Sequence, residues 1–149
     1  AAGAVTAAVR GAEDAQWLGF AAAEAQARGA TLQLLTVWNV LSRAGSVATM
    51  LDGLDGMARE RVGEVKELAD RVRALYPGLV VKHHVETGTS IPGTLVAATK
   101  DTELMVTARS GRRLSTAPAP GRVAHALIHH AHCPVAVVPA ALPAEADTT

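Results

Sequence analysis

The 149-residue sequence has one cysteine, Cys133, and few aromatic residues: two Trp, one Tyr and one Phe. One cysteine excludes an internal disulfide framework, and so few rings disfavour the stacking platforms that bind single-stranded nucleic acid. The 14 Lys and Arg residues balance 14 Asp and Glu residues, so neither nucleic acid nor a membrane surface would attract the chain electrostatically. The sequence shows no signal peptide and no apolar run of membrane length. We therefore expect a cytoplasmic protein.

What the chain does contain is a regular alternation of short apolar runs and helical patterns, in the length of one domain. The expected strands cover residues 4–9, 31–38, 79–86, 103–107 and 134–138. Helical patterns separate them, and the longest runs from about residue 47 to residue 76. This order predicts an α/β fold with a mostly parallel sheet and helices on both faces. In such a fold the ligand crevice lies at the carboxyl ends of the strands, where the strand order reverses.

Glycine, proline and acidic residues predict where helices begin and end. Glu13 and Asp14 suit the start of the first helix, because the helix dipole favours negative charge there. Gly29 supplies its stop, and Pro92 precedes a short helix expected over residues 93–100. Three glycines weaken the long helix, so we expect a bend or fraying near residues 52–56. Residues 140–149 are small and polar, which predicts a disordered tail after a domain spanning residues 1–139.

A basic loop leads from the fourth expected strand to the last helix, which should begin at Gly121. Four arginines lie in or beside this loop, at Arg109, Arg112, Arg113 and Arg122. Backbone N–H groups in such a loop and at a helix start can bind a phosphate. The same residues also suit a solvated loop that aids solubility, and the sequence leaves both interpretations open.

The histidines raise the question of a metal site. His125 and His129 share one helical face, and His132 and Cys133 follow closely, a spacing that zinc would accept. The same residues also fit an ordinary helix end, and we expect no metal site. We interpret Cys133 as a small packed residue, since nothing in the sequence places a base beside it.

The sequence offers little support for an enzyme. It contains no Walker-type lysine, no serine-hydrolase elbow and no HExxH motif. Glu13 and Asp14 are adjacent in one turn and are better interpreted as helix-start charges than as an acid–base pair. We expect no catalytic residues, and leave only weak ATPase activity open.

Three segments carry a resemblance to a known family through their order and spacing. Residues 4–38 read AVTAAVRGAEDAQWLGFAAAEAQARGATLQLLTVW, residues 88–111 read GTSIPGTLVAATKDTELMVTARSG, and residues 125–139 read HALIHHAHCPVAVVP. Together they resemble the universal stress proteins. The resemblance implies a Rossmann-like parallel five-stranded sheet in the order 3-2-1-4-5. It also implies a homodimer paired through the last strand, at Val135, Ala136, Val137 and Val138. Protein partners beyond this dimer stay unknown.

The resemblance further implies a nucleotide crevice, but the sequence departs from the ATP-binding branch of the family. That branch has an Asp at the end of the first strand and a later G-x2-G-x9-G-(S/T) motif. Nine residues still separate Gly111 from Gly121, but Arg10 stands at the Asp position. Ala108 replaces the first Gly and Arg122 replaces the Ser/Thr. The candidate nucleotide or anion crevice comprises Arg10, Val37, Ala108, Gly111, Gly121 and Arg122.

These departures affect the two ends of the crevice differently. Arg10 has only donors, so it cannot replace a charged acceptor that contributes roughly 1.5–3 kcal/mol, and we expect its bulk to fill the pocket. Arg122 instead adds a charge that suits phosphate. The leading interpretation is a homodimeric stress-response or regulatory protein with no cofactor, which does not bind ATP in the usual way. The alternative is a nucleotide (ATP or AMP) or simple anion (phosphate or sulfate) binder that uses the loop of residues 111–122.

Overall fold

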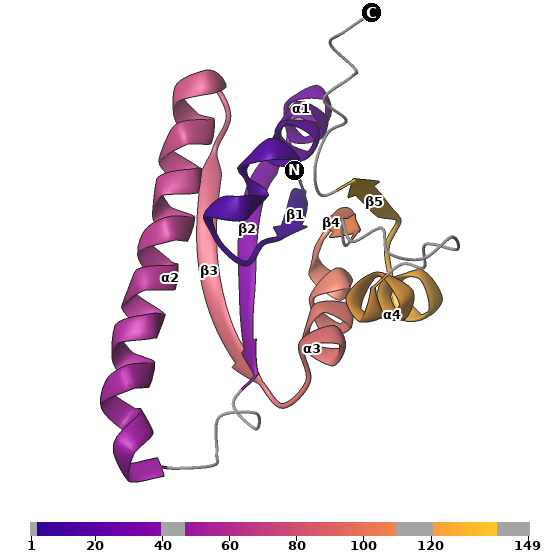
Figure 1. The fold of residues 1–149 in the computed structure, drawn as a ribbon. Coiled ribbons are helices and arrows are strands. Elements are labelled where there is room, and N and C mark those ends of the chain that lie inside the picture. The colour runs from indigo at the N-terminus through magenta and orange to yellow at the C-terminus, as the bar shows by residue number, and fades with distance from the viewer. Residues whose placement is uncertain (1–2, 40–46, 110–120, 140–149) are drawn as a thin grey trace, which may run out of the picture.

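The computed structural model describes residues 3–39, 47–109 and 121–139, with the backbone alone for residues 39 and 47–58. Five strands form one parallel sheet in the order β3-β2-β1-β4-β5 (Figure 1). The strands are β1 (Ala4–Ala8), β2 (Thr31–Asn39), β3 (Val81–Gly88), β4 (Leu104–Arg109) and β5 (Val135–Pro139). The predicted fold class and strand order are confirmed. The strand order reverses between β1 and β4, which is where a crevice is expected.

Helices cover both faces of this sheet (Figure 1). They are η1 (Ala12–Gln16), α1 (Leu18–Arg28), α2 (Val47–Leu75), α3 (Ile91–Ala98), η3 (Thr99–Asp101) and α4 (Arg122–His130), where η denotes a 3-10 helix. One face carries α1 and α2, and the other carries α3 and α4. Within the described residues, no helix is both long and apolar enough to cross a membrane.

Each face of the sheet has its own apolar cluster. The first cluster joins β1 and β2 to α1 and α2, and it includes the fully buried Leu18, Leu34 and Val65. The second joins β2 and β4 to α3 and α4 around Leu35 and Leu127. Because side chains alternate along a strand, Leu34 and Leu35 lie on opposite faces of the sheet. The sheet is thus packed on both sides, as parallel sheets are.

Several predicted boundaries need correction. The first helix does not start at Glu13, because a separate 3-10 turn precedes α1. The third strand begins at Val81 rather than residue 79, because the N–H of Leu79 donates to the carbonyl of Tyr76 (2.9 Å) and still closes a turn. The short helix begins at Ile91, since the Ser90 hydroxyl accepts from the N–H of Gly93 (3.1 Å) and caps it.

The fraying predicted near residues 52–56 is wrong, because α2 runs continuously from Val47 to Leu75. A glycine costs about 1 kcal/mol in a helix relative to alanine, and a long ladder of hydrogen bonds outweighs this penalty. Two glycine predictions are confirmed: Gly29 ends α1 in the left-handed conformation (φ 65°), and Gly121 is the N-cap of α4. The expected tail at 140–149 lies outside the described residues.

Candidate functional site

A cavity of about 360 Å³ lies at the carboxyl ends of β1, β2 and β4. Its walls also include η1 and the first turns of α3 and α4. The cavity therefore occupies the position where the strand order reverses, which agrees with the crevice predicted from the alternation of strands and helices.

Most of the candidate residues named from the sequence come together here. Five of the six line the cavity: Arg10, Val37, Ala108, Gly121 and Arg122. The sixth, Gly111, lies outside the described residues. Their proximity follows from the topology, because parallel strands bring their carboxyl ends to one edge. That they bind a ligand stays a prediction.

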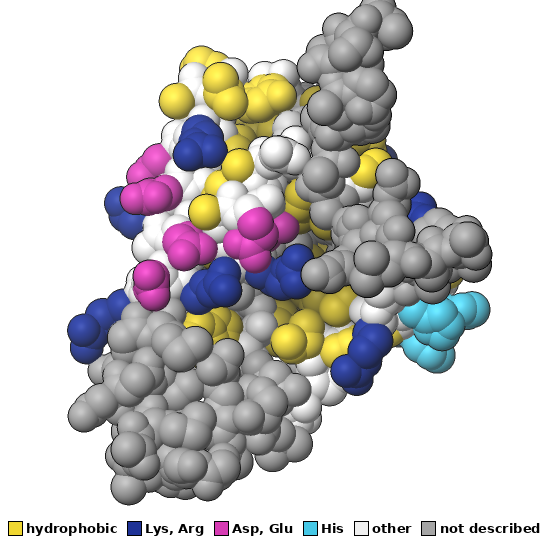
Figure 2. Space-filling model, in the orientation of Figure 1, with side chains coloured by type: hydrophobic (Ala, Val, Ile, Leu, Met, Phe, Trp, Pro, Cys, Tyr) yellow, Lys and Arg dark blue, Asp and Glu magenta, His cyan; other side chains and the backbone are white. Residues whose placement is uncertain are grey.

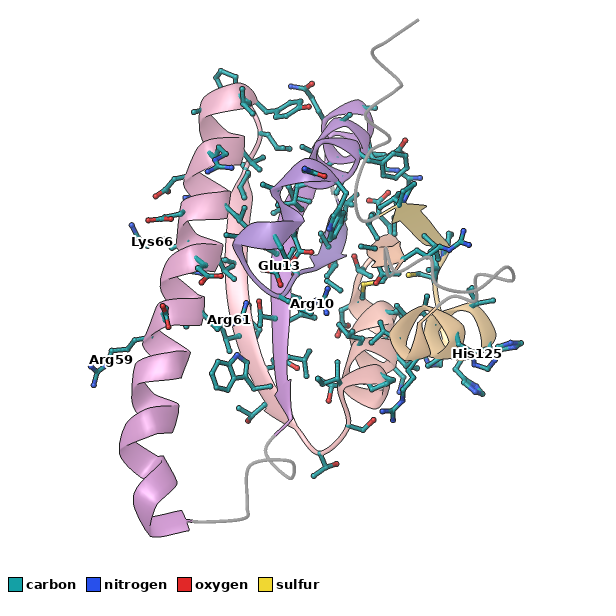
Figure 3. The ribbon with its side chains drawn as sticks, in the orientation of Figure 1. Arg10, Glu13, Arg59, Arg61, Lys66 and His125 are labelled. Atoms are coloured by element: carbon teal, nitrogen blue, oxygen red, sulfur yellow. The ribbon has the colours of Figure 1, made fainter. Side chains whose placement is uncertain are left out.

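Arg10 does not fill the pocket, contrary to expectation. Its side chain is exposed at the cavity wall, because its backbone is held from two sides. The N–H of Arg10 donates to Oδ2 of Asp14 (2.5 Å), and Nη1 of Arg61 donates to the carbonyl of Arg10 (3.0 Å). Figure 3 shows Arg10, Glu13 and Arg61 grouped where η1 faces α2.

Asp14 is the site residue that sequence reasoning undervalued. Its side chain lines the cavity, yet the residue is only 4% exposed. Oδ2 accepts from the N–H groups of Arg10 (2.5 Å) and Gly11 (3.1 Å), and Oδ1 accepts from Nε1 of Trp17 (2.8 Å). The sequence feature that could have indicated this role is Trp17, which follows Asp14 by three residues and can donate a hydrogen bond to it. Both carboxylate oxygens are thus engaged by the chain itself.

A set of charged side chains fastens this loop to α2. Arg61 lies 3.6 Å from Glu13 and 3.5 Å from Glu64, and Glu64 accepts from the N–H of Ala12 (2.9 Å). A Cβ at Gly11 would overlap the flexible ends of the Arg61 and Glu64 side chains, which would have to shift to admit a larger residue. Figure 2 shows acidic and basic side chains intermingled on this face of the molecule.

The opposite wall begins with the first turn of α4. Gly121 has an extended backbone, and within the described residues no side chain caps the N–H groups of this helix end. Such a terminus has a partial positive charge. Within the described residues no non-glycine residue has a positive φ, so Ala108 stands at its motif position without backbone strain. The loss of glycine there leaves the wall of the cavity intact.

The histidine pair lies away from this cavity, on α4. The rings of His125 and His129 have centroids 4.4 Å apart, but no group of three or more metal-binding side chains occurs among the described residues. Burial raises the pKa of Cys133, and its Sγ donates to the carbonyl of Pro134 (3.3 Å). A raised pKa means less thiolate at neutral pH, which agrees with a packing role.

Comparison with known proteins gives one consistent result. A family model described as the universal stress protein family matches residues 4–139. Among curated protein sequences, none matches the chain significantly. Many solved structures match it.

Three of these structures illustrate the similarity. A universal stress protein from Archaeoglobus fulgidus has a TM-score of 0.67 at 21% identity, covering 93% of this chain and 98% of its own. The universal stress protein UspA from Lactobacillus plantarum has a TM-score of 0.70 at 19% identity, covering 91% and 97%. A universal stress protein in complex with cAMP has a TM-score of 0.66 at 16% identity, covering 95% and 99%.

Proposed function

Because the chain belongs to the universal stress protein family, we propose that it is a homodimeric stress-response or regulatory protein that does not bind ATP in the usual way. It acts through protein contacts and is not an enzyme. The observation that carries this proposal is the state of Asp14, whose two oxygens are taken by donors of the chain itself.

The crevice offers a nucleoside few free hydrogen-bond acceptors among its described side chains. Arg10 follows β1 at the position where the ATP-binding branch has an Asp, and a guanidinium offers only donors. In the described wall of the cavity, Asp14 is the carboxylate that could accept a hydrogen bond from a nucleoside. It could do so only after its hydrogen bonds from Arg10, Gly11 and Trp17 were broken. Such bonds to a charged group are worth roughly 1.5–3 kcal/mol each. A nucleoside would therefore bind here at a substantial energetic cost.

A second function, the binding of a nucleotide or a simple anion, is favoured by one observation. The cavity of about 360 Å³ stays open beside Arg10 and Arg122. One structural neighbour is described as a complex with cAMP, which makes an adenine nucleotide the natural ligand to test against the proposal.

A calorimetric titration with ATP, ADP and AMP separates the two functions. We expect no micromolar affinity for the wild-type protein. The substitution Arg10→Asp restores an acceptor and should raise ATP affinity about tenfold or more. The matched control is Arg71→Asp, which changes the same charge at an exposed position of α2. Micromolar binding of ATP by the wild-type protein would overturn the proposal.

The proposed dimer rests on the position of β5 at one edge of the sheet. An edge strand presents unpaired backbone groups that can pair with a second chain, and we place the contact at Val135, Ala136, Val137 and Val138. Light scattering should give twice the chain mass of 15.3 kDa. Val137→Lys should reduce it to the monomer mass, whereas Val80→Lys, at an exposed position outside β5, should not. A monomeric wild-type protein would contradict this assembly.

A further inference from the structure

The cavity combines an apolar wall with a cationic mouth. Its wall includes Val37, Ile91, Leu95 and Val123. Leu95 is buried, and the other three are partly buried against the second apolar cluster. A polar sugar placed against this wall would lose hydrogen bonds to water without gaining partners there. The wall thus suits a hydrocarbon.

The charges at the mouth come from Arg10 and Arg122. Within the described part of the chain, neither guanidinium forms a hydrogen bond or ion pair. Asp14 contributes the opposing charge, but its oxygens already accept three hydrogen bonds from the chain. The described lining therefore carries two positive charges and one negative charge, which is complementary to a single negative charge on a ligand.

The volume limits the ligand further. At about 360 Å³ the cavity is near the small end of the range of roughly 300–1,000 Å³ that ligand sites occupy. The N–H groups at the start of α4, which no side chain of the described residues caps, lie at the same wall as Arg122 and add to the attraction for an anionic head. The volume, the apolar wall and the charge of the cavity therefore all favour a small ligand with an apolar part and one negative charge.

We propose that the crevice binds a small amphipathic carboxylate, such as a medium-chain fatty acid. The carboxylate lies between Arg10 and the start of α4, where an arginine fork can donate two hydrogen bonds to it. The hydrocarbon lies against Val37, Ile91 and Leu95. This inference goes beyond the proposed function, because it assigns a ligand to the crevice whether or not a nucleotide also enters it.

Calorimetric titration of the full chain with three probes tests this proposal. Octanoate has both the head and the hydrocarbon, octanol lacks the charge, and acetate lacks the hydrocarbon. We expect octanoate to bind about tenfold to a hundredfold more tightly than octanol, the range expected for a charge-assisted hydrogen bond. Acetate should give no measurable heat. Equal binding of octanol and octanoate, or no binding of octanoate, overturns the proposal.

Two matched pairs of variants separate the head from the hydrocarbon. Arg10→Met should weaken octanoate about tenfold or more and leave octanol unchanged, whereas Arg71→Met on the exposed side of α2 should alter neither. Val37→Thr places a hydroxyl in the apolar wall and should weaken both probes, whereas Val80→Thr at an exposed position should weaken neither. Undiminished octanoate binding by Arg10→Met overturns the assignment of the head.

An ATP titration of the same sample keeps this inference distinct from the proposed function. If neither ATP nor octanoate binds, only the carboxylate proposal is overturned. If ATP binds with micromolar affinity and octanoate also binds, the proposed function is overturned and the carboxylate site stands. If ATP alone binds, both are overturned.

Discussion

The two faces of the sheet are packed differently. On the face of α1 and α2, twenty of the described residues are buried in the apolar cluster, including the fully buried Leu18, Leu34 and Val65. In the cluster on the face of α3 and α4, the buried members among the described residues are Leu35, Leu95, Met105 and Leu127, and the other members are partly buried. The cavity of about 360 Å³ lies at the carboxyl ends of the strands, and its apolar lining comes mostly from this second cluster. One face is thus filled and the other is partly hollow.

Because of this difference, we expect the filled face to contribute mainly to stability and the hollow face to ligand binding. Close-packed interiors lose stability when even small groups are removed, so residues of the filled face have little freedom to serve a ligand. The hollow face retains apolar side chains that are only partly buried, such as Val37 and Val123. A ligand can cover these side chains and gain the free energy of their burial. The comparison predicts which substitutions affect unfolding and which affect binding.

The largest effect should come from two adjacent leucines of β2 that point to opposite faces. Leu34→Ala removes a fully buried side chain from the filled face and should lower the free energy of unfolding by about 3–5 kcal/mol. Leu35→Ala enlarges a cavity that already exists, so fewer contacts are lost and the cost should be about 2–3 kcal/mol. Urea unfolding followed by circular dichroism measures both values. Equal losses, or a larger loss for Leu35→Ala, would show that the hollow face is as tightly packed as the other.

The next effect concerns the adjacent acids of η1. Asp14→Asn keeps the shape of the side chain but removes one acceptor, so that an N–H of Trp17 or of the backbone loses its partner. We expect a loss of about 1–3 kcal/mol in the free energy of unfolding. Glu13→Gln removes the same charge from an exposed ion pair with Arg61, which should cost about 0–1 kcal/mol.

Both variants of η1 can be compared in the same urea titrations. The fluorescence of Trp17, which lies against Asp14, gives a second readout near the site. If Glu13→Gln were as destabilising as Asp14→Asn, the buried hydrogen bonds of Asp14 would not hold the loop that carries Arg10.

The alternation of apolar runs with helical patterns was sufficient to predict a parallel α/β sheet and the place of the crevice, whereas the strand order was predicted from the resemblance to the universal stress proteins. Buried strands such as β1 and β4 have continuous apolar sequences, and their parallel direction follows from alternation with helices. Five candidate residues reached the same cavity for this reason. These are properties of local sequence and of chain connectivity, and a single sequence contains both.

The part that could not be predicted depends on contacts between distant segments. Asp14 and Glu13 are equivalent in the sequence, but only Asp14 is buried, because α2 lies over η1 and pairs with Glu13 instead. Likewise, the outward position of Arg10 depends on Arg61, which is 51 residues away. No local propensity encodes such tertiary contacts.

The smallest expected change in stability concerns two buried threonines, Thr99 and Thr36, of which only Thr99 has a hydrogen-bonded hydroxyl among the described residues. Thr99 is 1% exposed, and its hydroxyl accepts from the N–H of His132 (2.9 Å) and donates to the carbonyl of Val96 (2.5 Å). It therefore ties the end of α3 to the segment after α4. Thr99→Val leaves the N–H of His132 without this acceptor and should lower the free energy of unfolding by about 1–2 kcal/mol.

Thr36 of β2 provides the matched control for Thr99. It is 4% exposed, and its hydroxyl has no hydrogen-bond partner among the described residues. Replacing it by the similarly shaped valine removes an unsatisfied polar group, so Thr36→Val should leave the urea midpoint unchanged or raise it. If single hydrogen bonds hold the hollow face, Thr99→Val and Thr36→Val must change the free energy of unfolding by amounts that differ in sign or size. If Thr99→Val left both the urea midpoint and the hydrogen exchange of the His132 amide unchanged, packing alone would hold α3 against α4, and the cavity between them would be more rigid than this comparison implies.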